Sequence, residues 1–127
     1  MIFVDTNVWM YAVGGAHPLR DETRNALEEM VDRRTAIATS AEVLQELLHA
    51  YLPVGRTETL DAALELATNL SEVWALTSDD IARSRRLHAE HPGLSSRDLT
   101  HLAVCLGNRA TGLLTYDRAL ASAFDRL

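Results

Sequence analysis

Four acidic residues of this chain stand at points where predicted strands end or predicted helices begin, and acids at such points can do chemistry. They are Asp5, Glu46, Asp98 and Asp117. No dedicated cluster of Cys or His accompanies them, and a set of oxygen ligands is typical of sites for hard divalent cations. The pattern therefore predicts a carboxylate-lined cation site, which the surrounding strands and helices must bring together.

Two of the acids follow short apolar runs. Asp5 comes directly after Ile2–Val4, and Asp117 comes shortly after Leu113–Thr115. An acid at the end of a strand lies at the carboxyl edge of a sheet, where open α/β folds bind ligands. Two such acids at the ends of parallel strands could meet across the sheet. Each could instead cap the helix that follows it, because Asp is a common N-cap.

Asp98 and His101 lie three residues apart in a predicted helix and can face the same side of it. The alternative for Asp98 is a capping box, because Ser95 fits the N-cap position and the acid then occupies the third helical position. For His101 we favour packing, or contact with a neighbouring ligand, over direct binding of a metal.

Glu46 competes with Glu42 for the remaining position, because residues four apart share one face of a helix. A capping box formed by Thr39 and Glu42 explains Glu42 without a metal. Glu46 has no such explanation, and a carboxylate that borders a buried stripe requires a partner. Its neighbours are apolar, namely Val43, Leu44, Leu47 and Leu48. We therefore favour Glu46 as the site residue and place Glu42 at the rim.

Hydrophobic periodicity and turn residues predict alternating strands and helices. Strands are expected at Ile2–Val4, Ala36–Ala38, Val73–Leu76 and Gly112–Thr115. Helices are expected over residues 6–11, 18–34, 78–91 and 95–108, from a Thr39-Ser40 cap to residue 51, and onward from residues 57 and 117. Short strands separated by helices indicate an α/β fold with a parallel sheet covered on both faces.

The bulk composition excludes several classes of protein. A length of 127 residues fits one domain spanning residues 1–127, and a net charge of −6 argues against non-specific binding of nucleic acid. The chain has 12 Arg and no Lys, so P-loop NTPases, Schiff-base enzymes and receiver domains, which need a lysine, are excluded.

Cys105 lies in an apolar helical run and is expected to be buried rather than nucleophilic. We expect a cytoplasmic protein, because no apolar run is long enough to cross a bilayer and residues 1–4 do not fit a signal peptide.

Four motifs in order along the whole chain resemble the PIN-domain family. They are Val4-Asp5-Thr6-Asn7, Ser40 with Glu46-Leu47, Asp98 with His101-Leu102-Ala103, and Thr115-Tyr116-Asp117. Each motif alone has low specificity, whereas all four at these intervals are specific. A free-standing chain of this length is similar to the VapC-type toxin ribonucleases, and only the crowded Thr39–Glu46 segment departs from the pattern.

The resemblance implies a three-layer α/β/α sandwich around a short parallel sheet of four or five strands. It also implies an endoribonuclease that depends on Mg²⁺, or on Mn²⁺, and cuts a specific structured RNA such as a tRNA or rRNA. Asp5, Glu46 and Asp98 would be the core metal ligands, with Asp117 binding directly or through water. Thr6, Asn7 and Thr115 would orient these ligands or touch the phosphate. A homodimer is implied, together with a cognate antitoxin through which any contact with DNA would be made.

Binding of RNA by an acidic chain requires local positive charge. Arg97, next to Asp98, is the favoured candidate; Arg83, Arg85 and Arg86 are further candidates, with Arg33 and Arg34 as a second patch.

The alternative function from a different class is a catalytically silent PIN-like binding module. A haloacid-dehalogenase-like phosphatase is disfavoured, because Asn7 stands where its second acid is needed and the chain has no lysine.

Overall fold

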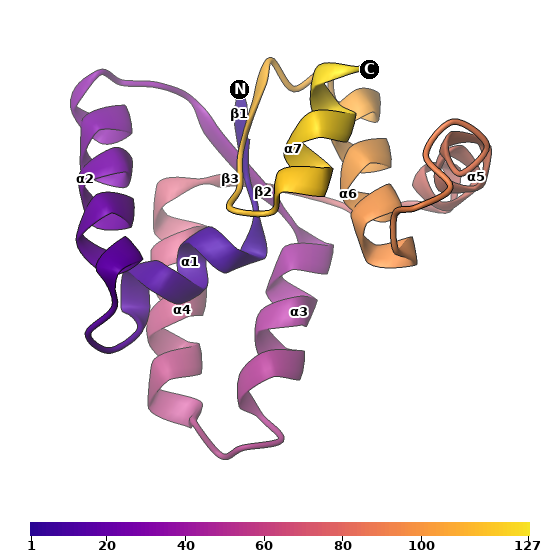
Figure 1. Ribbon diagram of the computed structural model, residues 1–127. Helices are drawn as coiled ribbons and strands as arrows, with labels where there is room; N and C mark the ends of the chain where they lie inside the picture. The colour runs from indigo at the N-terminus through magenta and orange to yellow at the C-terminus, as the bar shows by residue number, and fades with distance from the viewer.

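The computed structural model describes all 127 residues as four strands and seven helices (Figure 1). The strands are β1 (Ile2–Val4), β2 (Ile37–Ser40), β3 (Glu72–Trp74) and β4 (Gly112–Leu114). The helices are α1 (Thr6–Val13), α2 (Pro18–Asp32), α3 (Ala41–Tyr51), α4 (Thr57–Leu70), α5 (Ser78–Leu87), α6 (Ser96–Gly107) and α7 (Arg118–Asp125).

The four strands form one parallel sheet in the order β3-β2-β1-β4. Ile2 of β1 pairs with Ile37 on one side and with Gly112 on the other, so the first strand of the chain occupies an inner position. The chain moves outward from β1 to β3 and then returns to place β4 on the free side of β1. This reversal creates a topological switch point between β1 and β4, the place where open α/β sheets bind ligands.

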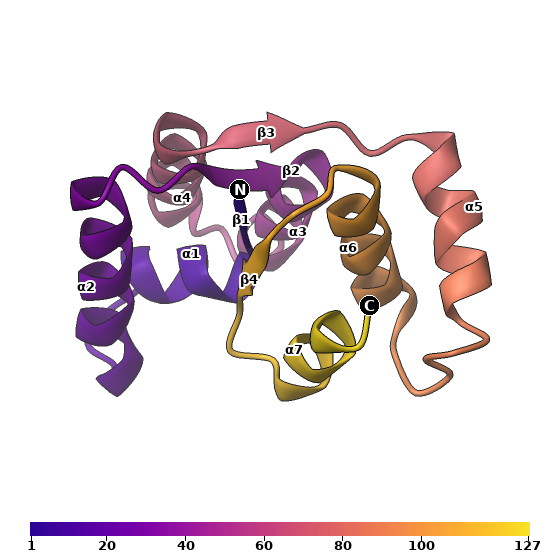
Figure 2. The same ribbon diagram turned by 90° about the horizontal axis from the view of Figure 1, so that it is seen from above.

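Helices cover the sheet in two groups and give the predicted three-layer α/β/α arrangement. On one side α1 packs against α2, α3 and α4; on the other side α6 packs against α5 and α7 (Figure 2). Two apolar cores follow this division, the larger one around Phe3 and Trp9 and the smaller one around Leu102 and Leu120. The inner strands β1 and β2 are largely buried between them, as is typical of a parallel sheet.

The start of α3 differs from the prediction. Ser40 is the N-cap, and its Oγ accepts a hydrogen bond of 3.1 Å from the Val43 backbone N–H. Thr39 instead lies inside β2, fully buried, where its Oγ1 donates to the Val4 carbonyl and accepts from Nε1 of Trp9. The proposed capping box of Thr39 and Glu42 was therefore wrong, because the buried indole and carbonyl use the Thr39 hydroxyl.

Other element boundaries moved by a few residues. Strand β2 lies at residues 37–40 rather than 36–38, and β3 lies at 72–74 rather than 73–76. Helix α5 ends at Leu87 rather than near residue 91, because a turn at residues 88–91 takes over its hydrogen bonding. Its N-cap is Thr77, and Asp80 completes a capping box with it.

Cys105 is packed in the larger core with 1% of its surface exposed, and burial raises the pKa of its thiol to about 12. The expectation of a buried, unreactive cysteine is thus confirmed, because such a thiol forms almost no thiolate at neutral pH. None of the helices combines the length and the apolar character needed to cross a lipid bilayer.

Candidate active site

A cavity of about 280 Å³ opens at the carboxyl ends of β1 and β4. All four predicted acids line it, and they come from the end of β1, from α3, from α6 and from the segment after β4. The other lining residues are Thr6, Asn7, Met10, Arg97 and His101. The structure therefore brings together side chains that are spread over most of the chain.

Asp5 links the end of the inner strand β1 to the segment after the edge strand β4. Its Oδ1 accepts a hydrogen bond of 2.8 Å from the Thr6 backbone N–H, which caps α1. Its Oδ2 accepts a hydrogen bond of 2.7 Å from the hydroxyl of Thr115, just after β4. Asp5 is only 6% exposed, and burial raises the pKa of its carboxyl despite the opposing influence of His101 and of these hydrogen bonds. The capping and site interpretations of Asp5 are therefore compatible.

The segment after β4 is positioned by Thr115 and Asn7. The Thr115 hydroxyl accepts a hydrogen bond from the Asp117 backbone N–H at 3.0 Å and a longer one, 3.4 Å, from Nδ2 of Asn7. Oδ1 of Asn7 accepts from the Tyr116 backbone N–H at 3.2 Å. Asp117 also caps α7, since its Oδ1 accepts from the Leu120 backbone N–H at 3.0 Å. These contacts hold the Asp117 carboxylate beside the end of β1.

Glu46 is held by two partners. Its Oε2 accepts a hydrogen bond of 2.9 Å from the Thr6 hydroxyl, and its Oε1 lies 2.5 Å from Nε2 of His101. Because the pKa of the imidazole is raised beside this carboxylate, the contact is an ion pair between Glu46 and His101. Burial opposes ionisation of Glu46, but His101, Thr6 and Arg97 outweigh it, and the pKa of the carboxyl is lowered.

His101 is 2% exposed and is the only cation at the bottom of the site. Burial disfavours the charged imidazolium, yet Glu46, Asp5 and Asp98 together outweigh burial and raise the pKa of the ring. From the sequence this histidine was expected to pack or to contact a neighbouring ligand. The signal available was only its spacing from Asp98, and nothing in the sequence indicated that Glu46 would be its ion-pair partner.

Asp98 lies in the first turn of α6, where its backbone N–H donates to Oγ of Ser95 at 3.2 Å, so Ser95 is the N-cap as expected. Its side chain lines the cavity and is half-buried. Burial and the neighbouring charges of Asp117 and Asp5 raise the pKa of the Asp98 carboxyl. The preceding residue, Arg97, is exposed at the mouth of the same cavity.

Two predicted residues do not line the cavity. Thr115 reaches it only through the Asp5 carboxylate, and Glu42 lies one helical turn before Glu46, half-buried and outside the lining. Among the arginines, Arg83 is committed to the fold, because its Nη1 donates to Oδ1 of the buried Asp80 at 2.8 Å. Arg85 and Arg86 are exposed on α5 and remain available.

Comparison with known proteins identifies the family. The PIN domain model matches residues 2–125, and "Ribonuclease VapC23" of Mycobacterium tuberculosis (strain CDC 1551) is 54% identical over 124 residues, 98% of each chain. This chain is a VapC-type member of the PIN-domain family. "Ribonuclease VapC13" of M. tuberculosis (strain H37Rv) is 33% identical over 123 residues, which cover 96% of this chain and 94% of that relative.

Solved structures confirm the PIN fold of this VapC-type chain. M. tuberculosis VapC20, described as a sarcin–ricin loop cleaving toxin, superimposes with a TM-score of 0.79 at 18% identity and covers 97% of this chain and 95% of its own. VapBC2 from Rickettsia felis, bound to a DNA fragment from its promoter, gives a TM-score of 0.75 at 24% identity and covers 100% and 93%. At these identities the likeness shows the fold alone.

Proposed function

We propose that this VapC-type chain is the toxin of a toxin–antitoxin pair and hydrolyses phosphodiester bonds of a specific structured RNA, a tRNA or rRNA, with the help of Mg²⁺ or Mn²⁺. Membership of the family and the ribonuclease names of its relatives support endoribonuclease as the activity. The observation that carries the finer proposal is the convergence of four acids from four separate parts of the fold on one cavity. The same convergence argues against the alternative, a catalytically silent PIN-like module.

The donor set fits a hard divalent cation. Asp5, Glu46, Asp98 and Asp117 supply carboxylate oxygens to one cavity, and the buried Oε1 of Glu46 has the His101 ring as its close partner. As they stand, no three His, Cys, Asp or Glu side chains form a group that could hold an ion. Ion binding would therefore draw the carboxylates closer together, which their mutual repulsion otherwise opposes. A bound ion of this kind activates water and neutralises the charge that develops on a phosphodiester during attack.

The residues around the acids would orient the carboxylates and the substrate and would take no part in the chemical step. The hydroxyl of Thr115 bonds to Asp5 and the hydroxyl of Thr6 bonds to Glu46, so each carboxylate is held in one orientation. Asn7 keeps the segment carrying Asp117 in place. Arg97 at the mouth would receive a backbone phosphate, because a guanidinium matches phosphate oxygens in charge and geometry. Glu42, one turn from Glu46, would lie at the rim, beyond direct contact with the ion.

The structural neighbours include toxin–antitoxin complexes, from Rickettsia felis and from Klebsiella pneumoniae, which supports an antitoxin as a partner. We further propose that the chain acts as a homodimer and contacts DNA only through this antitoxin. A net charge of −6 is consistent with that division, because a DNA-binding surface requires a basic face.

The decisive experiment maps new RNA 5′ ends after brief expression of the wild-type chain, with Asp5→Asn as the inactive control. A few sharp cuts that depend on Asp5 are expected, and they would also identify the RNA. The purified protein should then cut that RNA with Mg²⁺ or Mn²⁺ and stop when EDTA is added. Identical 5′ ends for the two proteins, both folded and free of antitoxin, would favour the silent binding module.

A further inference from the structure

A second cavity adjoins the acidic one along α1. Its volume is about 380 Å³, and two residues, Asn7 and Met10, line both cavities. Asn7, Met10, Tyr11 and Gly14 recur at the spacing of a single helical face, so one face of α1 runs from the carboxylates into this second cavity. Nothing in the proposed chemistry at the four acids uses this space.

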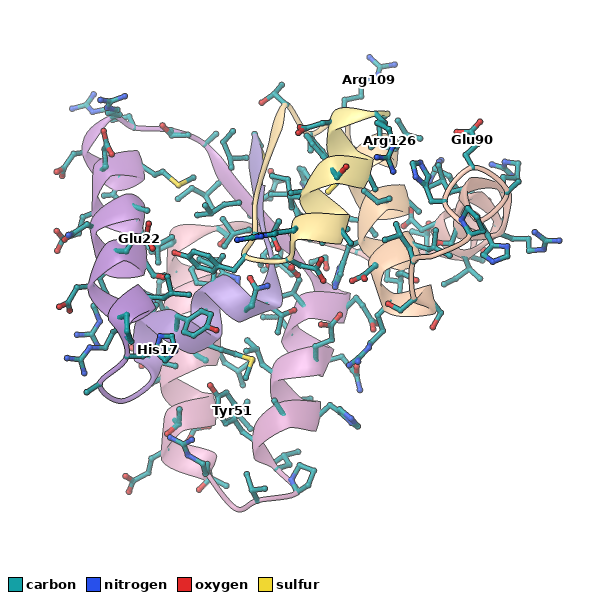
Figure 3. All side chains as sticks on the ribbon, in the orientation of Figure 1. His17, Glu22, Tyr51, Glu90, Arg109 and Arg126 are labelled. Atoms are coloured by element: carbon teal, nitrogen blue, oxygen red, sulfur yellow. The ribbon has the colours of Figure 1, made fainter.

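Three aromatic rings line the second cavity. The ring centroids of Tyr11 and His17 are 4.7 Å apart, and Tyr51 contributes a third ring from the end of α3. The guanidinium carbon of Arg56 lies 5.7 Å from the centroid of the Tyr51 ring. Figure 3 shows His17 and Tyr51 at the same end of the molecule, far from Arg109. Aromatic rings and guanidinium planes are the surfaces on which unpaired RNA bases stack.

The same cavity offers groups that can bond to the edge of a base. Tyr51 is 5% exposed, yet its hydroxyl makes no hydrogen bond within the protein and it lines the cavity. His17 caps α2 by accepting a hydrogen bond of 3.0 Å at Nδ1 from the Leu19 backbone N–H. In the neutral ring the proton therefore resides on Nε2, which is left free to donate.

We propose that this aromatic cavity, defined by Tyr11, His17, Tyr51 and Arg56, binds one unpaired nucleobase of the RNA substrate. The inference rests on the proposed ribonuclease function, which places the scissile phosphate at the four acids. Since Asn7 and Met10 are a common wall, a base in the aromatic cavity and the phosphate at the acids belong to neighbouring nucleotides. The cavity thereby selects substrates in which a base next to the cut is unstacked, as in a loop or bulge.

The test measures binding of uncut RNA, separately from cleavage. Asp98→Asn protein, whose altered residue lies outside the aromatic cavity, is titrated with a short fluorescent RNA centred on the mapped cut, or of mixed sequence if mapping finds no cut. Each base near the centre is removed in turn to give an abasic site. One position should be sensitive, with binding weakened about 10-fold, the scale of a single stacked base.

The second arm introduces Arg56→Gln, or Tyr51→Phe, into the same protein. In either variant the intact RNA should bind more weakly, and removal of the sensitive base should then have little further effect. Arg109→Gln is the matched control, because it removes one exposed positive charge at the opposite end of the molecule and should leave the abasic sensitivity unchanged.

The proposal is overturned if no base position is sensitive, or if the sensitivity is unchanged in both Arg56→Gln and Tyr51→Phe. It is also overturned if these variants weaken only binding of the antitoxin, since the cavity would then hold a protein side chain. Absence of cleavage by the wild type, with a base position that still depends on Arg56, would reject the ribonuclease function and keep the nucleobase site.

Discussion

Nε2 of His101 lies 2.5 Å from Oε1 of Glu46 and 3.7 Å from Oδ1 of Asp5, so one buried cation is shared by two of the four site carboxylates. The imidazole offsets part of the repulsion among acids that the fold holds at one sheet edge. Its Nε2 also contacts the Glu46 oxygen that we propose as a ligand of the metal ion. Four predictions test the division of roles at this edge.

Substitution of His101 by Ala should destabilise the protein by about 3 kcal/mol, because a partly buried carboxylate loses its ion-pair partner. The pKa of His101 is raised in the folded chain, so the stabilisation is fully present below the ordinary value of 6.5 and is lost as the pH rises through the folded value. Urea unfolding of both proteins on either side of that range measures this. In the double variant with Glu46→Gln the loss should shrink, and additive losses would exclude the ion pair as the cause.

The Glu46→Gln and Glu42→Gln variants form a matched pair one helical turn apart. Only Glu46 lines the acidic cavity, so Glu46→Gln should lower cleavage by about 100-fold or more, whereas Glu42→Gln should keep cleavage near the wild-type level. Initial rates on the mapped RNA at saturating Mg²⁺ measure the difference. Equal losses in the two variants would place Glu42 in the site after all.

Asp98→Asn should abolish cleavage while stabilising the metal-free protein by about 1 kcal/mol, the scale of relieving a strained functional site. Burial and the charges of Asp117 and Asp5 raise the pKa of the Asp98 carboxyl, so the wild type loses stability as the pH rises from the ordinary value of 3.8 through the folded value. The advantage of Asn should therefore be larger at neutral than at acidic pH. Thermal unfolding in EDTA tests this, and an advantage that grows on acidification would contradict it.

Thr115→Val removes a hydroxyl that donates to Asp5 and accepts from the Asp117 backbone, at nearly constant volume. We expect a loss of about 1 kcal/mol in stability and a loss of about 10- to 100-fold in Mn²⁺ affinity, because a carboxylate loses its orienting partner. Calorimetric titration with Mn²⁺ gives the affinity. Thr111→Val is the control, since its hydroxyl lies near the other end of β4; the same loss there would point to general loosening of the strand.

The sequence was sufficient to predict what depends on local pattern. Asp5 was located because it directly follows a strand, and Asp117 because it comes shortly after another one. Ser95 was recognised as a cap because its spacing to Asp98 is local. The α/β class and the covered parallel sheet followed from the alternation of short apolar runs with helices. Glu46 was favoured over Glu42 as the site residue because its apolar neighbours left it in need of a partner, and the family motifs then added its expected role as a metal ligand.

Long-range relations could not be predicted from local pattern. Nothing local distinguishes Thr39 from Ser40 as the cap of α3; the choice depends on the Trp9 indole and the Val4 carbonyl, which reach Thr39 only in the fold. Likewise Arg83 was a candidate for RNA until its pairing with Asp80 assigned it to the structure. The aromatic cavity joins side chains from α1, the turn before α2 and the end of α3, and no single sequence window contains them.

The hydrogen bond between Thr115 and Asp5 spans 110 positions of the chain, and the strand before Thr115 pairs directly with the first strand. A growing polypeptide that still lacks its last strand carries Asp5, Glu46 and Asp98 but has no closed edge on which to gather them. We therefore expect the chain to gather these acids into one site only after its last strand has been made.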